Sequence, residues 1–289
     1  MFDSKLKNNI IIFSFAALLA VTISIFLFYT FKPRLDLSKA GPSKVIGKVE
    51  AAGKRAEPKP NYLSEEQLAS QAKQNIGSIH LPILLYHKTP DNFELQMQHL
   101  RDTGYTPVTM QEVSGIISKK TKGPAKPIAI TFDDGFSDQF KAFEILKKFN
   151  FKSTSYIIVG GKESNYCIGS ERRPENNCGD SYMSWDEVKR LSDSGLVEIG
   201  SHSIDHLQLS ALPEIIQKFQ IIESKKILEA KIGKSVTSFA YPYGKYNQTS
   251  ISLVRLAGYT NGVGVEASED QNINNLFILN RIRDTKDLR

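Results

Sequence analysis

Two carboxylates and two imidazoles in this chain have the types and the spacing of a catalytic metal site. Asp133 and Asp134 are neighbours and precede Gly135, while His202 and His206 lie four residues apart. One carboxylate with two imidazoles suits a borderline divalent cation such as zinc, and three protein ligands leave positions open for water and substrate. Successive side chains on a strand face opposite sides, so both carboxylates can share one pocket only if the backbone turns, as Gly135 permits.

Each pair also has a simpler interpretation. The sequence Asp-Asp-Gly is commonly a turn, and histidines four residues apart commonly lie on an exposed surface. If His202 and His206 lie on one turn of helix, both imidazoles face the same side and can bind one ion. Because the chain has only five histidines and both pairs follow expected strands, we favour the metal site.

The elements that must position these side chains are short apolar segments alternating with segments of helical periodicity. Strands are expected at residues 81–86, 127–132, 154–159, 197–200, 237–241 and 277–282. Helices are expected at residues 138–149, 184–195, 213–233 and 249–258, the second of which begins with a Ser-x-x-Glu capping box. Strands separated by helices predict a parallel α/β sheet or barrel, in which catalytic groups gather at the carboxyl ends of the strands. His87, Asp133, His202 and residues 241–244 all follow expected strands.

The net charge of +6 does not indicate a nucleic-acid-binding protein, because the excess lies near the N-terminus. Residues 32–60 contain eight basic and three acidic side chains, whereas residues 61–289 contain 27 of each. A domain that binds phosphate backbones needs clustered lysine and arginine within its fold. We therefore expect no nucleic-acid partner.

The N-terminal region has the composition of a membrane anchor. Residues 10–31 are 22 consecutive uncharged residues, which as a helix would span roughly 33 Å, enough to cross the hydrocarbon core of a bilayer. A cleaved signal peptide is the alternative, but its apolar part is usually about 7–15 residues long and ends in small residues. We therefore expect a cytoplasmic N-terminus at residues 1–9, a transmembrane helix at 10–31, a basic Pro/Lys/Ala-rich linker at 32–78 and a folded domain at 79–289.

The two cysteines, Cys167 and Cys178, have the wrong spacing for a Cys-x-x-Cys zinc or redox site. In an oxidising compartment they would form a disulfide across the intervening loop, which would stabilise the fold by about 3 kcal/mol on a chain-entropy estimate. In the cytoplasm they would remain unpaired thiols. With an expected membrane anchor in the same chain, we favour the disulfide.

Three segments make the chain resemble the polysaccharide deacetylases, the NodB-homology domain of carbohydrate esterase family four. The first motif is Thr131–Gly135 (TFDDG), the second is His202–His206 (HSIDH) and the third is Phe239–Gly244 (FAYPYG). The similarity runs from about residue 80 to residue 283, and the first two motifs are specific. This resemblance implies a distorted (β/α) barrel of parallel strands ringed by helices.

The resemblance also implies a role for individual residues of these motifs. Asp133 would be the catalytic base, and Asp134, His202 and His206 would bind the metal. We expect the metal to be zinc, with cobalt, nickel or iron as alternatives. A backbone N–H near Tyr243 would help to hold the oxyanion that forms on the acetyl carbonyl.

Two features depart from the common pattern of this family. Ala240 stands where many members have an arginine that steers the base, and the chain has no standard Leu-x-His motif near its C-terminus. Instead, His87 follows the first strand and Arg281 lies near the C-terminus, which is similar to the branch that acts on exported poly-N-acetylglucosamine. This resemblance implies that His87 is the general acid and that Arg281 replaces the missing arginine. The alternatives are a histidine that supports the barrel rim and an arginine on the surface.

The expected reaction is metal-dependent hydrolysis of N-acetyl groups on an N-acetylhexosamine polysaccharide, with release of acetate. The alternatives are an O-acetyl esterase acting on cell-wall sugars and a catalytically inactive, membrane-tethered glycan-binding protein. Inactive members of the family usually lose a metal ligand or the base. This chain retains the four corresponding residues, which are Asp133, Asp134, His202 and His206. Since acetylated polymers of this kind lie outside the cytoplasm, we expect a single-pass inner-membrane protein with its catalytic domain in the periplasm.

Overall fold

The computed structural model describes residues 77–160, 182–272 and 274–283. The expected cytoplasmic N-terminus, the transmembrane segment and nearly all of the linker lie outside these residues, as do Cys167 and Cys178. Within the described ranges, no helix is both long enough and apolar enough to cross a membrane. The structure therefore bears on the expected domain that begins at residue 79.

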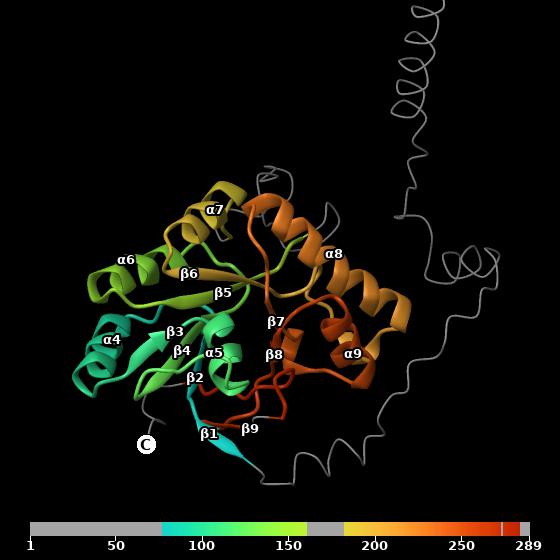
Figure 1. Cartoon of the computed structure of the whole chain (residues 1–289). Coiled ribbons are helices and arrows are strands. Elements are labelled where there is room, and N and C mark those ends of the chain that lie inside the picture. The colour runs from blue at the N-terminus through green and yellow to red at the C-terminus, as the bar shows by residue number, and fades with distance from the viewer. Residues whose placement is uncertain (1–76, 161–181, 273, 284–289) are drawn as a thin grey trace, which may run out of the picture. The chain divides into compact units, whose positions relative to one another are not determined.

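A parallel β-sheet forms the centre of this domain (Figure 1). Its strands lie in the order β2-β4-β5-β6-β7-β8, and β3 also pairs with β4. Nearly every strand residue is buried, because helices cover the sheet. For this reason β2 and most of β4 read as apolar runs, whereas β5 also contains buried serine and threonine. The strands are Ile83–Tyr86 (β2), Thr106–Val108 (β3), Pro127–Phe132 (β4), Ser153–Ile157 (β5), Val197–Ser201 (β6), Ser238–Ala240 (β7) and Asn261–Val263 (β8).

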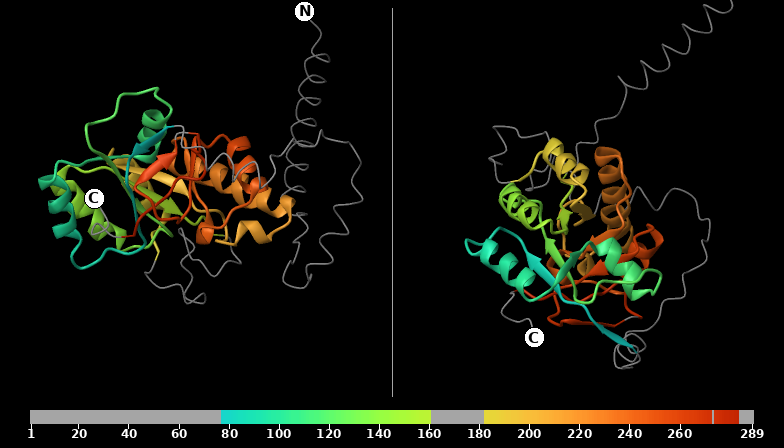
Figure 2. Two further views of the ribbon diagram at one scale, coloured as in Figure 1. Left: turned by 90° about the horizontal axis from the view of Figure 1, so that it is seen from below. Right: turned by 60° about the vertical axis from the view of Figure 1, so that its left-hand side comes forward.

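Helices surround the strands in the described part of the chain (Figures 1 and 2). Ser184 and Glu187 form the predicted capping box at the start of α7, and Gly233 ends α8 in the left-handed conformation. The α-helices are Phe93–Asp102 (α4), Met110–Ile117 (α5), Gln139–Phe149 (α6), Trp185–Asp193 (α7), Glu214–Ile232 (α8) and Gln248–Leu256 (α9), with short 3₁₀ turns at Leu209–Ala211 (η3) and Pro242–Gly244 (η4).

The C-terminal segment 279–282 bridges the two outer strands of the parallel sheet. Leu279 pairs with Val263 of β8 and Ile282 pairs with Leu84 of β2, both in the parallel direction. The parallel α/β architecture is therefore as predicted, and this segment connects its two ends. The continuous strand expected at residues 277–282 is wrong, because residues 276–278 form a turn and a bend and only isolated bridges follow.

Several elements of the structure are absent from the sequence-based expectation. Helix α4, strand β3 and helix α5 lie between the first two expected strands, although Thr109 and Glu112 form a recognisable capping box before α5. Strand β1 (Ser78–His80) pairs antiparallel with β9 (Asp270–Asn272), outside the main sheet. Both β1 and β9 are only three residues long, so neither has enough alternating positions to form a detectable pattern.

The parallel sheet brings the candidate residues to one edge. His87 follows β2, Asp133 follows β4, His202 follows β6 and Tyr241 follows β7. The carboxyl ends of parallel strands meet at the same edge, so residues far apart in the sequence become neighbours there. The strand order explains why one carboxylate motif and one histidine motif can form a single site.

Candidate active site

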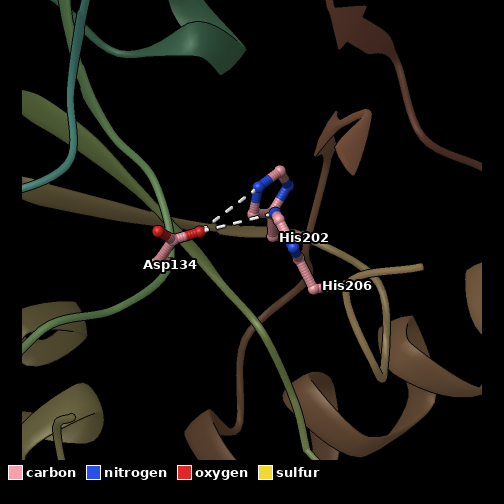
Figure 3. A group of neighbouring side chains, drawn as sticks. All are labelled: Asp134, His202 and His206. Carbon is pink, nitrogen blue, oxygen red and sulfur yellow. Dashed lines mark ion pairs between the residues drawn. The ribbon is translucent and has the colours of Figure 1, made fainter. Parts of the chain in front are cut away.

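Asp134, His202 and His206 converge on one point at the carboxyl edge of the sheet. The carboxylate of Asp134 points toward both imidazoles (Figure 3), with its Oδ1 3.6 Å from Nε2 of His202 and 3.6 Å from Nε2 of His206. One ligand atom from each of the three residues lies within 4.8 Å of the others. Such a group of one oxygen and two nitrogens can hold a divalent cation and leaves further coordination positions open.

Left-handed backbone conformations create this convergence. Asp134 has a φ of 72° and Gly135 a φ of 80°, so the chain turns sharply after β4, as the two adjacent carboxylates require. Ser203 and His206 also have positive φ values, of 66° and 52°. The possible helical turn at His202 and His206 is not formed. Strand β6 ends at Ser201, and a loop with left-handed backbone at Ser203 and His206 brings the two imidazoles together.

The buried His202 ring is oriented by a main-chain carbonyl. Its Nδ1 lies 2.8 Å from the oxygen of Ala240 at the end of β7. A carbonyl oxygen only accepts hydrogen bonds, so the partner assigns the proton to Nδ1 and leaves the Nε2 lone pair facing Asp134. This is the usual arrangement of a metal-binding histidine, whose second nitrogen donates to a carbonyl or carboxylate.

The chemistry of the three side chains fits a divalent cation. Oδ1 of Asp134 is buried and has no hydrogen-bond partner among the described residues. Burial and the negative charge of Asp133 raise the pKa of Asp134, which a cation at this position would reverse. Burial lowers the pKa of His206 to about 4, so its imidazole is neutral at neutral pH, as a metal ligand must be.

Asp133 lies beside this group and is held by Arg281. The guanidinium donates from Nη1 to Oδ1 and from Nη2 to Oδ2, both at 2.7 Å. Burial alone would raise the pKa of Asp133, but the charge and the hydrogen bonds of Arg281 outweigh it and hold the pKa below its usual range. Asp133 is therefore a carboxylate at neutral pH, and its Oδ2 is 3.9 Å from Nε2 of His202.

Arg281 reaches the site through the segment that bridges the sheet. Its backbone N–H donates to the oxygen of Glu266, and its Nε donates to the oxygen of Gly264 at 2.8 Å, just beyond β8. Only 1% of Arg281 is exposed, so the alternative of a surface arginine is wrong. Ala240 is also buried, but its methyl group cannot donate a hydrogen bond to Asp133. Arg281 supplies the guanidinium instead.

His87 and Tyr243 lie at the edge of the same site. His87 is exposed after the end of β2, which pairs with β4, and it is an electrostatic neighbour of Asp133, Asp134 and His206. The ring of Tyr243 is 4.5 Å from that of His206, measured between centroids, and its backbone is left-handed with a φ of 58°. The structure thus brings both residues to the group, whereas Cys167 and Cys178 lie outside the described residues.

One buried side chain at the site is missed by the sequence-based reasoning. Gln139, the first residue of α6, is 3% exposed and donates from Nε2 to the carbonyl oxygens of Asp133 and His87. The position of Gln139 in the sequence could have indicated that it is buried, because it shares one helix face with Ala142 and Leu146. A glutamine on an apolar face must find hydrogen-bond partners inside the protein.

Comparisons with known proteins bear on the family of this chain. The sequence profile of the polysaccharide deacetylases matches residues 120–262. YxkH of Bacillus subtilis strain 168, assigned by its name to the polysaccharide deacetylases, is 32% identical over 216 residues, which cover 70% of this chain and 71% of YxkH. A poly-beta-1,6-N-acetyl-D-glucosamine N-deacetylase of Staphylococcus aureus strain MRSA252 is 28% identical over 193 residues, which cover 63% of this chain and 62% of that enzyme.

A solved structure has a similar fold. The deacetylase PplD of Streptococcus pyogenes superposes with a TM-score of 0.63 at 24% identity, covering 73% of this chain and 95% of PplD. The resemblance inferred from the TFDDG, HSIDH and FAYPYG motifs is confirmed by the profile match and by YxkH. This chain belongs to the polysaccharide deacetylase family.

Proposed function

We propose that this protein hydrolyses N-acetyl groups of a poly-N-acetylglucosamine-type polymer with the aid of a divalent cation. The observation that carries the proposal is the ionised, buried Asp133 directly beside the Asp134, His202 and His206 group. The substrate class is supported by the Staphylococcus aureus relative, whose name specifies poly-beta-1,6-N-acetyl-D-glucosamine. It is supported further by Arg281, which pairs with the base where Ala240 provides no arginine.

Asp133 is suited to act as the general base. Its low pKa keeps it ionised, and the two hydrogen bonds from Arg281 fix the plane of its carboxylate. A divalent cation held by Asp134, His202 and His206 would supply Lewis-acid polarisation of the acetyl carbonyl and increase the acidity of water in the site. Asp133 then accepts a proton from the attacking water as the new carbon–oxygen bond forms.

His87 and Tyr243 act on the other atoms of the acetamide group. The N–H of Tyr243, in the 3₁₀ turn η4, donates to the oxygen that becomes negatively charged. His87, as the imidazolium, donates a proton to the nitrogen as the carbon–nitrogen bond breaks. One water is consumed, and the products are acetate and a free amino sugar.

The location of the domain is part of the same proposal. Polymers of this type lie outside the cytoplasm, so residues 10–31 would anchor the chain in the inner membrane and the domain would act in the periplasm. The linker, with its proline and lysine residues, would hold the domain away from the bilayer.

Acetate release from defined glycans tests this proposal. The full chain, loaded with zinc, is incubated with β-1,6-linked and β-1,4-linked N-acetylglucosamine oligomers, peptidoglycan and O-acetylated xylan, with the Asp134→Ala variant as control. We expect the fastest release from the β-1,6-linked oligomers and none from the control. Release from xylan alone would replace the proposal with an O-acetyl esterase, and binding of a glycan without release from any substrate would indicate an inactive glycan-binding protein.

A further inference from the structure

The carboxamide of Gln139 joins the main chains of the proposed acid and the proposed base. Its Nε2 lies 2.8 Å from the carbonyl oxygen of Asp133 and 3.1 Å from that of His87. Its Oε1 accepts a hydrogen bond of 2.6 Å from the hydroxyl of Ser155 in β5. All hydrogen-bonding groups of the amide therefore have partners. Its two N–H groups donate to the two carbonyls, and its oxygen accepts from the neighbouring strand.

These contacts begin where the backbone pairing of β2 and β4 ends. The N–H of Asp133 donates to the oxygen of Tyr86 at 2.8 Å, at the end of the ladder between these strands. One residue farther along, the carbonyls of His87 and Asp133 cannot bond to each other, because both are acceptors. A side chain with two N–H donors can connect them, and Gln139 supplies these donors from the start of α6.

The residue before Gln139 secures the loop that follows His87. Asp138 accepts a hydrogen bond from the Thr89 N–H on its Oδ2 at 2.9 Å, and its carbonyl accepts from the Thr89 hydroxyl at 2.9 Å. The N-cap residue of α6 thus holds the loop after His87 by two hydrogen bonds. A histidine that is exposed at a strand end gains a defined position from its backbone, because little packing restrains its ring.

We propose that Gln139 is a positioning residue that sets the separation between the general acid His87 and the general base Asp133. This inference rests on the roles given to these two residues in the proposed function. Gln139 does not touch the reacting atoms; it acts through the two carbonyls. Proton delivery to the leaving nitrogen depends on sub-ångström placement, so loss of the amide donors impairs amide hydrolysis without removing any reacting group.

The test compares Gln139→Met with a matched control. Methionine fills a similar volume and donates no hydrogen bond, while Gln217→Ala removes another buried glutamine, whose Nε2 donates to the carbonyl of Leu212 in a different part of the fold. In the zinc-loaded full chain, Gln139→Met should lower kcat for N-acetyl hydrolysis on the order of 10- to 100-fold at unchanged KM. Hydrolysis of an activated acetate ester, whose leaving group needs no proton, should change far less. Gln217→Ala should leave the ratio of the two rates unchanged.

Two further variants separate positioning from a general loss of fold. Ser155→Ala removes only the anchor of the amide, so it should reproduce the Gln139→Met effect in weaker form. In a His87→Ala background, Gln139→Met should cause a much smaller further loss of amide hydrolysis, because the acid whose separation from Asp133 it sets is gone. Equal losses in the presence and absence of His87, or equal losses on amide and ester, would overturn the proposal.

A spectroscopic readout keeps this inference separate from the proposed function. In the zinc-loaded protein, Gln139→Met should shift the imidazole NMR signals of His87, while those of His80 and His99 stay in place. If the unmodified protein releases no acetate but the His87 signals still shift, the proposed function fails and the positioning stands. Unchanged His87 signals would overturn the positioning, whatever the activity.

Discussion

The guanidinium of Arg281 meets the carboxylate of Asp133 in a parallel fork, although 148 residues separate them in the sequence. Both side chains are almost fully buried, with 1% of Arg281 and 3% of Asp133 exposed. A bidentate pair of this kind fixes the orientation as well as the charge of the carboxylate. It also couples the proposed base to the C-terminal segment that bridges β8 and β2.

Replacing Arg281 should raise the pKa of the base. In Arg281→Met the burial of Asp133 is no longer opposed by its strongest positive neighbour, so its pKa rises. Because Asp133 acts as a base only when ionised, the acidic limb of the kcat/KM profile should move to higher pH. Arg281→Lys should move this limb less, since lysine keeps the positive charge but cannot donate the two parallel hydrogen bonds. Arg101→Met, which removes an exposed arginine, is the control. An unshifted acidic limb would contradict the assignment of Asp133 as the base.

The same pair should make stability depend on pH. The pKa of Asp133 is lower in the folded than in the unfolded protein, so its contribution is present above the unfolded value, about 3.9, and is lost as the pH falls through the folded value. At pH 7, Arg281→Met should lower the free energy of unfolding by about 3–5 kcal/mol, because it leaves a buried charge unpaired. Denaturant titrations should show this difference shrinking below about pH 4. A difference that is independent of pH would show that the charge pair is not its cause.

Asp133→Asn should keep the metal and lose most turnover. The substitution removes proton acceptance but none of the three candidate ligands, so bound zinc measured by mass spectrometry should be unchanged. It also weakens the partner of the buried Arg281, so the variant should be less stable than the unmodified protein by up to about 3 kcal/mol. Loss of zinc from Asp133→Asn, with zinc retained in Asp134→Asn, would mean that the two carboxylates exchange roles.

Removing any one of the proposed metal ligands should empty the site. Asp134→Ala, His202→Ala and His206→Ala should each lose bound metal, whereas His99→Ala, at a histidine in α4, should not. Chelation should abolish acetate release, and added zinc or cobalt should restore it. Because the pKa of His206 is about 4, its imidazole stays neutral at pH 6, and metal should still bind there. Full activity of the metal-free protein would contradict the mechanism.

His87→Ala should distinguish a general acid from a rim-supporting histidine. As the acid, His87 contributes on the order of 10²–10⁴-fold to amide hydrolysis and far less to hydrolysis of an activated ester. Since His87 is exposed, its removal should leave metal content and the melting temperature nearly unchanged. Equal losses on amide and ester, together with a lower melting temperature, would assign His87 to support of the barrel rim.

The N-terminal segment and the cysteines predict a topology that can be measured in cells. Protease added to spheroplasts should digest the domain that follows residue 31, because the proposed location is periplasmic. Cys167 and Cys178 should react with thiol reagents only after reduction. Free thiols, with a domain protected from protease in spheroplasts, would place it in the cytoplasm and require a different substrate.

The sequence by itself determined the residues of the candidate metal group and the order of the main elements. Asp133–Gly135 and His202–His206 are contiguous motifs, and each follows a short strand that the sequence predicts. Once the strands are parallel, their carboxyl ends must lie at one edge, so the meeting of Asp134 with both histidines follows from local patterns. The family was also evident at this level, because TFDDG and HSIDH are short and unbroken.

The backbone conformation between His202 and His206 could not be predicted from the sequence. The spacing of His202 and His206 suited a helical turn, but positive φ values at Ser203 and His206 place the imidazoles side by side through a loop instead. Side-chain spacing alone does not distinguish these two backbones, because both can bring residues four apart to one point. The choice depends on β6 and on the carbonyl of Ala240, which belongs to a different strand.

The resemblance pointed to Arg281, but only the tertiary structure shows how Arg281 and Gln139 contact the proposed base and the proposed acid. Arg281 reaches Asp133 because residues 279–282 bridge β8 and β2, and this bridge consists of isolated pairs where the sequence predicted a continuous strand. Gln139 joins the carbonyls of His87 and Asp133 because β2 and β4 are neighbours in the sheet and α6 starts beside both. Contacts between distant residues depend on strand order and on the path of the chain between strands. No local pattern of residues encodes either, so the contacts of these two side chains form only when the sheet is assembled.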